Sequence, residues 1–373
     1  MIFSAHPTAS EPRRLGVEVH GVRLNLTCNY EPLLHCVADL LEGATRPWWD
    51  QPDLVVNGIW RTEPLPDQTC AFGDVPAGEL GKRMRLGTDD LVWFDTHRDK
   101  DLQLRFRRDG AVRVFDVDYC YRPSAEKVAK HPDYQVRKFF TLTPYLVQFP
   151  IAWHLARTRG WVLMHASAVA AGDRAVLIAG LGGSGKTTTC VALMAQAGMT
   201  LLTENLLFSD GAAVLPLPEP IRLTDESLTL LTGRAREALV PIDLRGALSR
   251  KTLFRLPVPA TARPVRPAAI FLPQFSERGF VRPIPPDVAC ELLAASNRLA
   301  LEIDNYEWYA AALDLLWPQA GNAERELQAL RRLTATTPCF VLGIDRAAGV
   351  GAVVDSILRC LGGASHALAE VAS

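Results

Sequence analysis

The chain has 373 residues, of which 48% are hydrophobic and 22% charged, which is ordinary for a globular protein of one or two domains. Its formal net charge of −1 argues against a dedicated nucleic-acid or membrane-surface binder. The eight cysteines are scattered and form no CxxC pair, so we expect reduced thiols and no structural zinc. With no secretory signal and no apolar run of membrane-spanning length, we expect a cytoplasmic protein that binds neither membrane nor nucleic acid.

The first elements predicted are strands and one helix. Apolar and polar residues alternate over 15–26 around a central glycine, which predicts two short strands or one bulged strand. Residues 31–42 have the pattern of an amphipathic helix, which Gly43 would end. The segment 44–88 is rich in proline and glycine and predicts no definite element.

A hairpin and a helix complete the first part of the chain. Alternating residues flank Asp109-Gly110, which predicts a hairpin with its turn at these two residues. A helix is expected over 143–158, with a kink or a break at Pro150. We therefore assign residues 1–150 to an α+β domain, which carries no chemical motif.

The second part of the chain begins with two apolar stretches on either side of Ala171-Gly172-Asp173. Two strands joined by so tight a turn pair antiparallel. The first strand starts at Trp161 and includes His165, and the second ends at Ala179. A hairpin therefore leads directly into the glycine-rich segment that follows.

That segment is a complete Walker A motif, with Gly180, four residues, then Gly185, Lys186 and Thr187. An apolar strand precedes it and a helical pattern follows it, which is the context that the motif requires. Glycines let backbone N–H groups approach phosphate oxygens, and the start of a helix adds partial positive charge. We expect a nucleotide phosphate-binding site formed by Gly180, Gly182, Gly183, Ser184, Gly185, Lys186, Thr187 and Thr188.

The same glycines also match the dinucleotide fingerprint G-x-G-x-x-G, with Glu204 near the place of the ribose-binding acid. A dinucleotide loop needs no lysine and hydroxyl after its last glycine. A magnesium-bound triphosphate uses both, since the lysine bridges phosphates and the hydroxyl ligates the metal. Lys186 and Thr187 therefore favour ATP with Mg²⁺.

Further elements follow the motif. Residues 198–209 predict a strand that carries Glu204 and Asn205, which we expect to be parallel to its neighbour and to end near the phosphate loop. After the turn at Asp210-Gly211 we expect a short strand, then a buried strand near 267–272. Helices over 286–301 and 306–316, a strand over 339–344 and a helix over 349–361 complete the domain 151–373.

Around the motif, the residues resemble a known family. The hairpin with Met164 and His165, the loop Gly180–Thr187 and the strand 201–207 are similar to the core of HPr kinase/phosphorylase and of related bacterial proteins. The resemblance covers roughly 160–345. It implies an α/β fold with the P-loop core and mixed sheet of the HPr kinase/phosphoenolpyruvate carboxykinase type.

The resemblance also implies roles. His165 matches the family's histidine beside the phosphates, and Glu204-Asn205 fall where the family has two aspartates that handle magnesium and take the acceptor's proton. Glu204 keeps a carboxylate and could hold the metal with Thr187, whereas the amide of Asn205 accepts no proton at neutral pH. Glu204 or His165 would be the catalytic base that receives the acceptor's proton. Lys186 would act on the transferred phosphate.

Basic residues provide candidate contacts to the phosphates or to an anionic acceptor: Arg222, Arg250 and Lys251. The function expected is an ATP-dependent kinase that transfers the γ-phosphate to a hydroxyl of a protein, a peptide or a small molecule. The first domain would select this acceptor, and association into a homo-oligomer stays open. The alternatives are a non-catalytic ATP-binding regulator or scaffold, which Asn205 favours, and carboxykinase-like or phosphorolytic chemistry on the same fold.

Overall fold

The computed structural model describes residues 13–197, 199–229, 231, 234–237, 239–242, 251–255, 263–319 and 321–371. Contacts divide the chain into two compact units. Unit 1 comprises the described residues of Met1–Trp153 and Trp308–Pro318, and unit 2 those of His154–Asp243, Ala247–Glu307 and Gln319–Ser373. Helices and mixed sheets confirm the α/β class.

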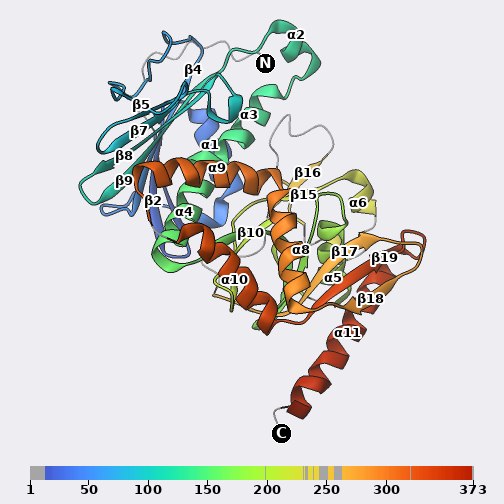
Figure 1. Ribbon diagram of the computed structural model, residues 1–373. Coiled ribbons are helices and arrows are strands. Elements are labelled where there is room, and N and C mark those ends of the chain that lie inside the picture. The colour runs from blue at the N-terminus through green and yellow to red at the C-terminus, as the bar shows by residue number, and fades with distance from the viewer. Residues whose placement is uncertain are drawn as a thin grey trace. The chain divides into compact units, whose positions relative to one another are not determined.

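Unit 1 contains a nine-stranded sheet of order β3-β1-β2-β4-β9-β8-β7-β6-β5, of which Figure 1 labels several strands. Neighbours are antiparallel except that β4 is parallel to both β2 and β9. The strands are β1 (Arg13–Val19), β2 (Val22–Cys28), β3 (Thr45–Arg46), β4 (Leu54–Arg61), β5 (Gly78–Glu79), β6 (Met84–Leu86), β7 (Asp90–Trp93), β8 (Leu102–Asp109) and β9 (Val112–Cys120).

Unit 1 also contains helices, several of which contact this sheet. They are α1 (Glu31–Leu40), η1 (Glu42–Ala44), η2 (Thr96–Arg98), α2 (Ala125–Lys130), α3 (Tyr134–Thr143), the π-helical turn η3 (Pro144–Gln148) and the start of α4 (Phe149–Arg159). The later residues of α9 (Leu301–Leu316) also belong here. Among them Tyr309 is fully buried, and its ring lies 5.2 Å from that of Phe106 and 6.3 Å from that of Phe115.

Two predictions for unit 1 are resolved by backbone geometry. His20 and Gly21 have φ of 50° and 74°, so the segment 15–26 forms two strands joined by a turn. The predicted hairpin is confirmed as β8–β9, but its turn residues are Gly110 and Ala111, one position later than predicted, because Asp109 pairs with Val112.

No break occurs at Pro150: the backbone of Thr143, Pro144 and Phe149 is α-helical, so the helical run continues from α3 through η3 into α4. The predicted irregularity is the π-helical turn η3, which ends two residues before Pro150.

Unit 2 is built on a mixed sheet of order β14-β13-β10-β11-β17-β19-β18, with β12 also paired to β10. Strands β11, β17 and β19 are parallel, and the other pairs are antiparallel. The strands are β10 (Val162–Ala171), β11 (Arg174–Ala179), β12 (Thr200–Thr203), β13 (Leu206–Ser209), β14 (Val214–Pro216), β17 (Arg266–Phe275), β18 (Phe280–Pro283) and β19 (Cys339–Ile344). A separate pair is formed by β15 (Ile221–Leu223) and β16 (Thr252–Phe254).

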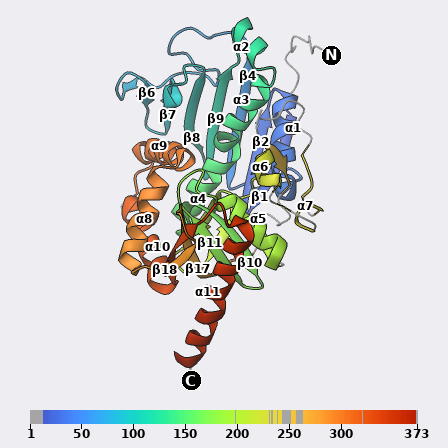
Figure 2. The same ribbon diagram turned by 90° about the vertical axis from the view of Figure 1, so that its right-hand side faces the viewer.

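Helices cover both faces of this sheet, as Figure 2 shows, with α8 and α10 on one side of β11 and β17 and α5 on the other. Val176 and Ile178 of β11 pack in the core with residues of α5 and α11, whereas Leu177 packs in the core with residues of α8 and α10. The helices are α5 (Lys186–Ala197), α6 (Asp225–Thr229), α7 (Arg234–Glu237), α8 (Pro286–Arg298), α10 (Asn322–Thr336) and α11 (Gly349–Val371). Burial on both faces is why the central strands read as continuous apolar runs.

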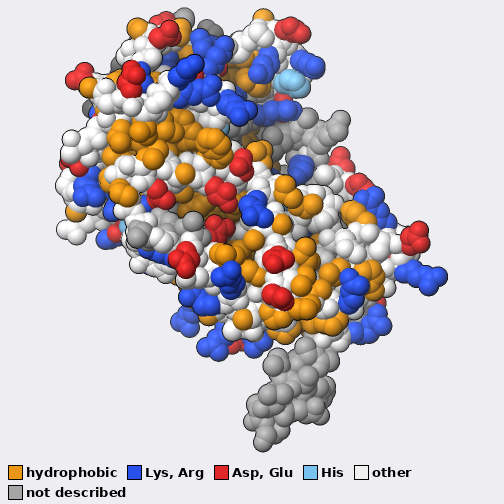
Figure 3. Space-filling view, viewed as in Figure 1, with side chains coloured by type: hydrophobic (Ala, Val, Ile, Leu, Met, Phe, Trp, Pro, Cys, Tyr) orange, Lys and Arg blue, Asp and Glu red, His pale blue; other side chains and the backbone are white. Residues whose placement is uncertain are grey.

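The exposed residues of α8 include apolar side chains as well as charged ones. Val288 and Leu292 are 40% and 43% exposed, and Leu299, just after the helix, is 72% exposed. Figure 3 shows apolar side chains at the surface over this helix. Among the described residues, no helix is both long enough and apolar enough to cross a membrane.

All eight cysteines are free thiols, and all but Cys360 are buried. Burial raises the pKa of each thiol, to about 11 for Cys28 and about 12 for Cys36 and Cys339. Cys190 is fully buried within α5, and burial raises the pKa of its thiol as well. These side chains therefore act as small apolar residues.

Candidate functional site

The glycine-rich loop joins β11 to α5, so that Lys186 is the first residue of the helix. Gly180, Gly183 and Gly185 have φ of +150°, +77° and +94°. A Cβ added at Gly185 would lie 3.3 Å from Cδ1 of Ile344. Positive φ and this close contact explain why glycine is needed at Gly185.

Lys186 is buried against its own loop. Its Nζ donates hydrogen bonds to the carbonyl oxygens of Gly180, at 2.8 Å, and Leu181, at 2.9 Å. Burial lowers the pKa of the ammonium to about 8, although the negative charges of Glu204 and Glu302 act in the opposite direction. A phosphate in the loop would offer the ammonium a charged partner in place of neutral carbonyls.

Thr187 contacts the first of the two candidate residues that follow β12. Its hydroxyl donates to Oε1 of Glu204 at 2.6 Å. Two oxygen ligands of the kind that Mg²⁺ prefers are thus adjacent. Among the described residues, no group of three or more His, Cys, Asp or Glu side chains could hold a metal ion. Magnesium fits this ligand set, because it commonly takes few protein ligands and completes its shell with phosphate and water.

The strand predicted over 198–209 is wrong in two respects. It is divided into β12 and β13, with Glu204 and Asn205 at the break, and both parts pair antiparallel with β10. The hydroxyl of Ser167 donates to the backbone carbonyl of Glu204, and Thr203 Oγ1 donates to the carbonyl of Leu206 at 2.7 Å. In the sequence, the polar residues Thr203, Glu204 and Asn205 interrupt the apolar run, and this interruption was the signal for the break.

A buried carboxylate that was not among the predicted site residues stabilises the backbone at this break. Oε1 of Glu219 accepts from the backbone N–H of Leu206 at 2.6 Å and lies 3.4 Å from Thr203 Oγ1. Burial raises the pKa of Glu219 to about 8, although the positive charge of Arg222 acts to lower it. An acid within an apolar, proline-rich stretch, three residues before an arginine, was the available signal.

Arg222 lies among three carboxylates. Its Nε is 3.3 Å from Oε2 of Glu204, and its Nη2 is 3.9 Å from Oε2 of Glu219 and 3.8 Å from Oε1 of Glu302. Burial acts to lower the pKa of the guanidinium, but these three negative charges outweigh it and raise the pKa. Glu302 lies in the first turn of α9, because this helix begins at Leu301 and not at residue 306 as predicted. The preceding helix α8 ends at Arg298 and not at residue 301 as predicted.

His165 joins the site from β10. Its Nε2 is 3.1 Å from Oδ1 of Asn205, and its backbone N–H donates to Oδ1 of Asn297 at 3.0 Å. An amide oxygen only accepts, so Nε2 carries the hydrogen. Burial, followed by the positive charge of Lys186, lowers the pKa of the imidazole to about 4. The ring is therefore neutral at pH 7.

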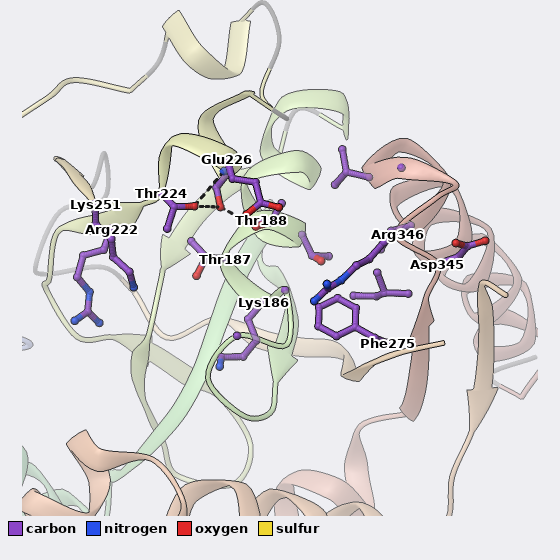
Figure 4. Close-up of a pocket in the computed structure, with 18 residues that line it drawn as sticks. Lys186, Thr187, Thr188, Arg222, Thr224, Glu226, Lys251, Phe275, Asp345 and Arg346 are labelled. Atoms are coloured by element: carbon purple, nitrogen blue, oxygen red, sulfur yellow. Dashed lines mark hydrogen bonds between the residues drawn. The ribbon is translucent and has the colours of Figure 1, made fainter. Parts of the chain in front are cut away.

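A cavity of about 470 Å³ opens over the loop and the start of α5. Figure 4 shows Lys186, Thr187 and Thr188 in its middle, Arg222 and Lys251 on one side, and Phe275 with Arg346 on the other.

The two ends of the cavity differ in chemistry. At one end, the Arg346 guanidinium carbon lies 3.8 Å from the centre of the Phe275 ring. At the other, Arg222 and Lys251 are cationic. The cavity is lined by several residues predicted from the sequence: Gly183, Gly185, Lys186, Thr187, Thr188, Arg222 and Lys251. The predicted residues that do not belong to this lining are Gly180, Gly182, Ser184, His165, Glu204 and Asn205. Arg250 lies outside the described residues.

Comparison with known proteins adds no identity. No protein-family model and no curated protein matches the chain. The chemistry of the site therefore carries the functional argument.

Proposed function

We propose that the protein is a Mg²⁺-ATP-dependent kinase that transfers the γ-phosphate to a hydroxyl group. The observation that carries the proposal is the 2.6 Å hydrogen bond between Thr187 and Glu204 beside Lys186. Together they provide two hard oxygen ligands and one cation at the N-terminus of a helix, which is the set that phosphoryl transfer uses. The cavity over these residues supports the same function.

Each residue then has a role. Backbone N–H groups of Gly183 and Gly185 and the N-terminus of α5 would hold phosphate oxygens, and Lys186 would bridge the β- and γ-phosphates. Thr187 and Glu204 would hold the magnesium ion, which neutralises phosphate charge when bound. Arg222 and Lys251 would stabilise negative charge on the transferred group.

The base of the nucleotide would lie at the opposite end of the cavity. Phe275 is 44% exposed and Arg346 is stacked against it. A planar guanidinium on an aromatic ring offers a surface on which a purine can stack. The stacked pair of Phe275 and Arg346 at one end, with Arg222 and Lys251 at the other, supports a nucleotide bound along the cavity.

We also propose that unit 2 has a P-loop core of the HPr kinase/phosphoenolpyruvate carboxykinase type. The antiparallel hairpin β10–β11 before the loop, the mixed sheet and the position of His165 beside Asn205 support this proposal. Unit 1 would then select the acceptor, in a cytoplasmic protein.

A second candidate is an ATP-binding regulator or scaffold without turnover. Asn205 favours it, because its amide takes the place of a carboxylate that could receive a proton. The carbonyls that hold Lys186 also favour it, because they occupy the donor that would stabilise the transferred phosphate.

Two measurements test the proposal. Calorimetric titration with Mg²⁺-ATP measures binding, and [γ-³²P]ATP incubated with hydroxyl acceptors or water measures transfer. Lys186→Ala should lower kcat/KM by about 10²-fold or more. Lys130→Ala, which removes an exposed lysine of α2, should change neither measurement. ATP binding without transfer to any acceptor would select the regulator, and absence of ATP binding would refute both candidates.

A further inference from the structure

The proposed reaction releases a proton, and the residues predicted from the sequence are poorly suited to take it. Both carboxylate oxygens of Glu204 are engaged, Oε1 by Thr187 and Oε2 by Arg222. The amide of Asn205 accepts no proton at neutral pH. His165 is a weak base, because burial lowers its pKa to about 4. A further acceptor for the proton is needed.

Glu302 is placed to fill this need. Its side chain is 39% exposed, and its Oε1 lies 3.8 Å from Nη2 of Arg222. Its negative charge also acts on Lys186 and on His165. The carboxylate is therefore held beside Arg222, while part of it stays open to solvent.

Its position relative to the cavity is also suitable. Arg222 lines the cavity, whereas Glu302 does not belong to the described lining. A nucleotide would fill the cavity, so an acceptor must approach the γ-phosphate from outside it. In-line transfer requires the acceptor oxygen to attack opposite the departing diphosphate. Glu302 lies beside a residue of the cavity wall, where such an acceptor could reach it.

We propose that Glu302 is the general base of this site and receives the proton of the acceptor hydroxyl. This inference rests on the proposed kinase function. The acceptor oxygen forms a bond to the γ-phosphorus as the bond from that phosphorus to the β–γ bridging oxygen breaks. The electron pair of the broken bond leaves with ADP, and the hydroxyl proton passes to a Glu302 oxygen and later to solvent. Arg222 is the positioning residue, because it contacts both Glu204 and Glu302.

The test is Glu302→Gln, which keeps the shape of the side chain and removes its ability to take a proton. The probe is [γ-³²P]ATP with Mg²⁺ and water or free L-serine as acceptor. We expect turnover to fall by about 10²- to 10⁴-fold, while the Kd for Mg²⁺-ATP changes less than about threefold. Glu302→Asp should retain part of the activity.

Asp304→Asn is the matched control. Asp304 is an exposed acid in the same first turn of α9, so the variant loses the same charge from the same helix. It should keep wild-type turnover, and an equal loss in both variants would overturn the inference. Wild-type turnover in Glu302→Gln, with activity still abolished by Lys186→Ala, would overturn the inference and leave the kinase in place. Absence of turnover in the wild type would refute the kinase itself, together with this inference.

Discussion

Replacing the buried acid Glu219 by glutamine should change the pH dependence of folding stability. The amide keeps an oxygen that can accept from the N–H of Leu206. It removes the only proton that this side chain can gain or lose. Burial raises the pKa of Glu219 from 4.5 to about 8, and the charges of Glu204 and Glu302 act in the same direction, against that of Arg222.

The direction in which folding stability changes with pH follows from proton linkage. The folded state holds the proton more tightly than the unfolded chain, so the stabilisation is fully present below pH 4.5 and is lost as the pH rises through about 8. Between these values the folded protein binds one more proton, and the free energy of unfolding falls by about 1.4 kcal/mol per pH unit. From about pH 5.5 to 7.5, the wild type should lose about 3 kcal/mol relative to Glu219→Gln.

Urea unfolding followed by far-UV circular dichroism measures this difference at each pH. Below about pH 8 the folded protein keeps Glu219 protonated and as neutral as the glutamine of the variant, so the wild-type curve minus the variant curve isolates the titration of Glu219. The control is Glu291→Gln, an exposed acid of α8, whose curve should stay parallel to that of the wild type. Parallel curves for Glu219→Gln and wild type, within about 0.5 kcal/mol, would refute the buried, proton-binding state of Glu219.

Three further predictions follow from the contacts described above. Gly185→Ala should weaken Mg²⁺-ATP binding and destabilise the protein by about 1 kcal/mol or more, because φ is +94° there, whereas Gly182→Ala, with open space around its Cβ, should have a smaller effect on thermal unfolding. Asp118→Asn breaks a buried pair in unit 1, in which Arg61 binds both carboxylate oxygens at 2.7 and 2.9 Å, and should destabilise the protein by roughly 3 kcal/mol in urea unfolding. The ring of His165 should stay neutral down to about pH 4 in an NMR titration, so its contribution to stability is lost as the pH falls from 6.5 to about 4; a ring that titrates near 6.5 would contradict its burial.

A strand or hairpin could be predicted from the sequence where the residues that determine it lie close together in the chain. The hairpin β8–β9 is confirmed because turn chemistry and alternation lie within a few residues of one another. Strand β4 was missed, although Leu54–Arg61 alternates buried and half-buried residues, because prolines and glycines on both sides suggested a loop. Its central place in the sheet of unit 1 comes from pairing with β9, about sixty residues later in the chain.

The site shows the same limit. Lys186 and Thr187 could be found because glycine spacing marks them directly. The antiparallel pairing of the strands on either side of Glu204 depends on β10, which lies about forty residues earlier. Glu302 gave no signal at all, since only the fold brings the first turn of α9 to Arg222.

The buried thiols make the native protein its own reporter of unfolding. A thiolate, not a thiol, reacts with alkylating dyes, and burial both shields these groups and raises their pKa. Apart from the reaction of the half-buried Cys360, a dye that fluoresces on thiol alkylation should therefore give no signal until the fold opens. Cys190 lies four residues after Lys186 on α5. The rate at which it is labelled would therefore measure how strongly a bound nucleotide suppresses unfolding around that helix, without any engineered label.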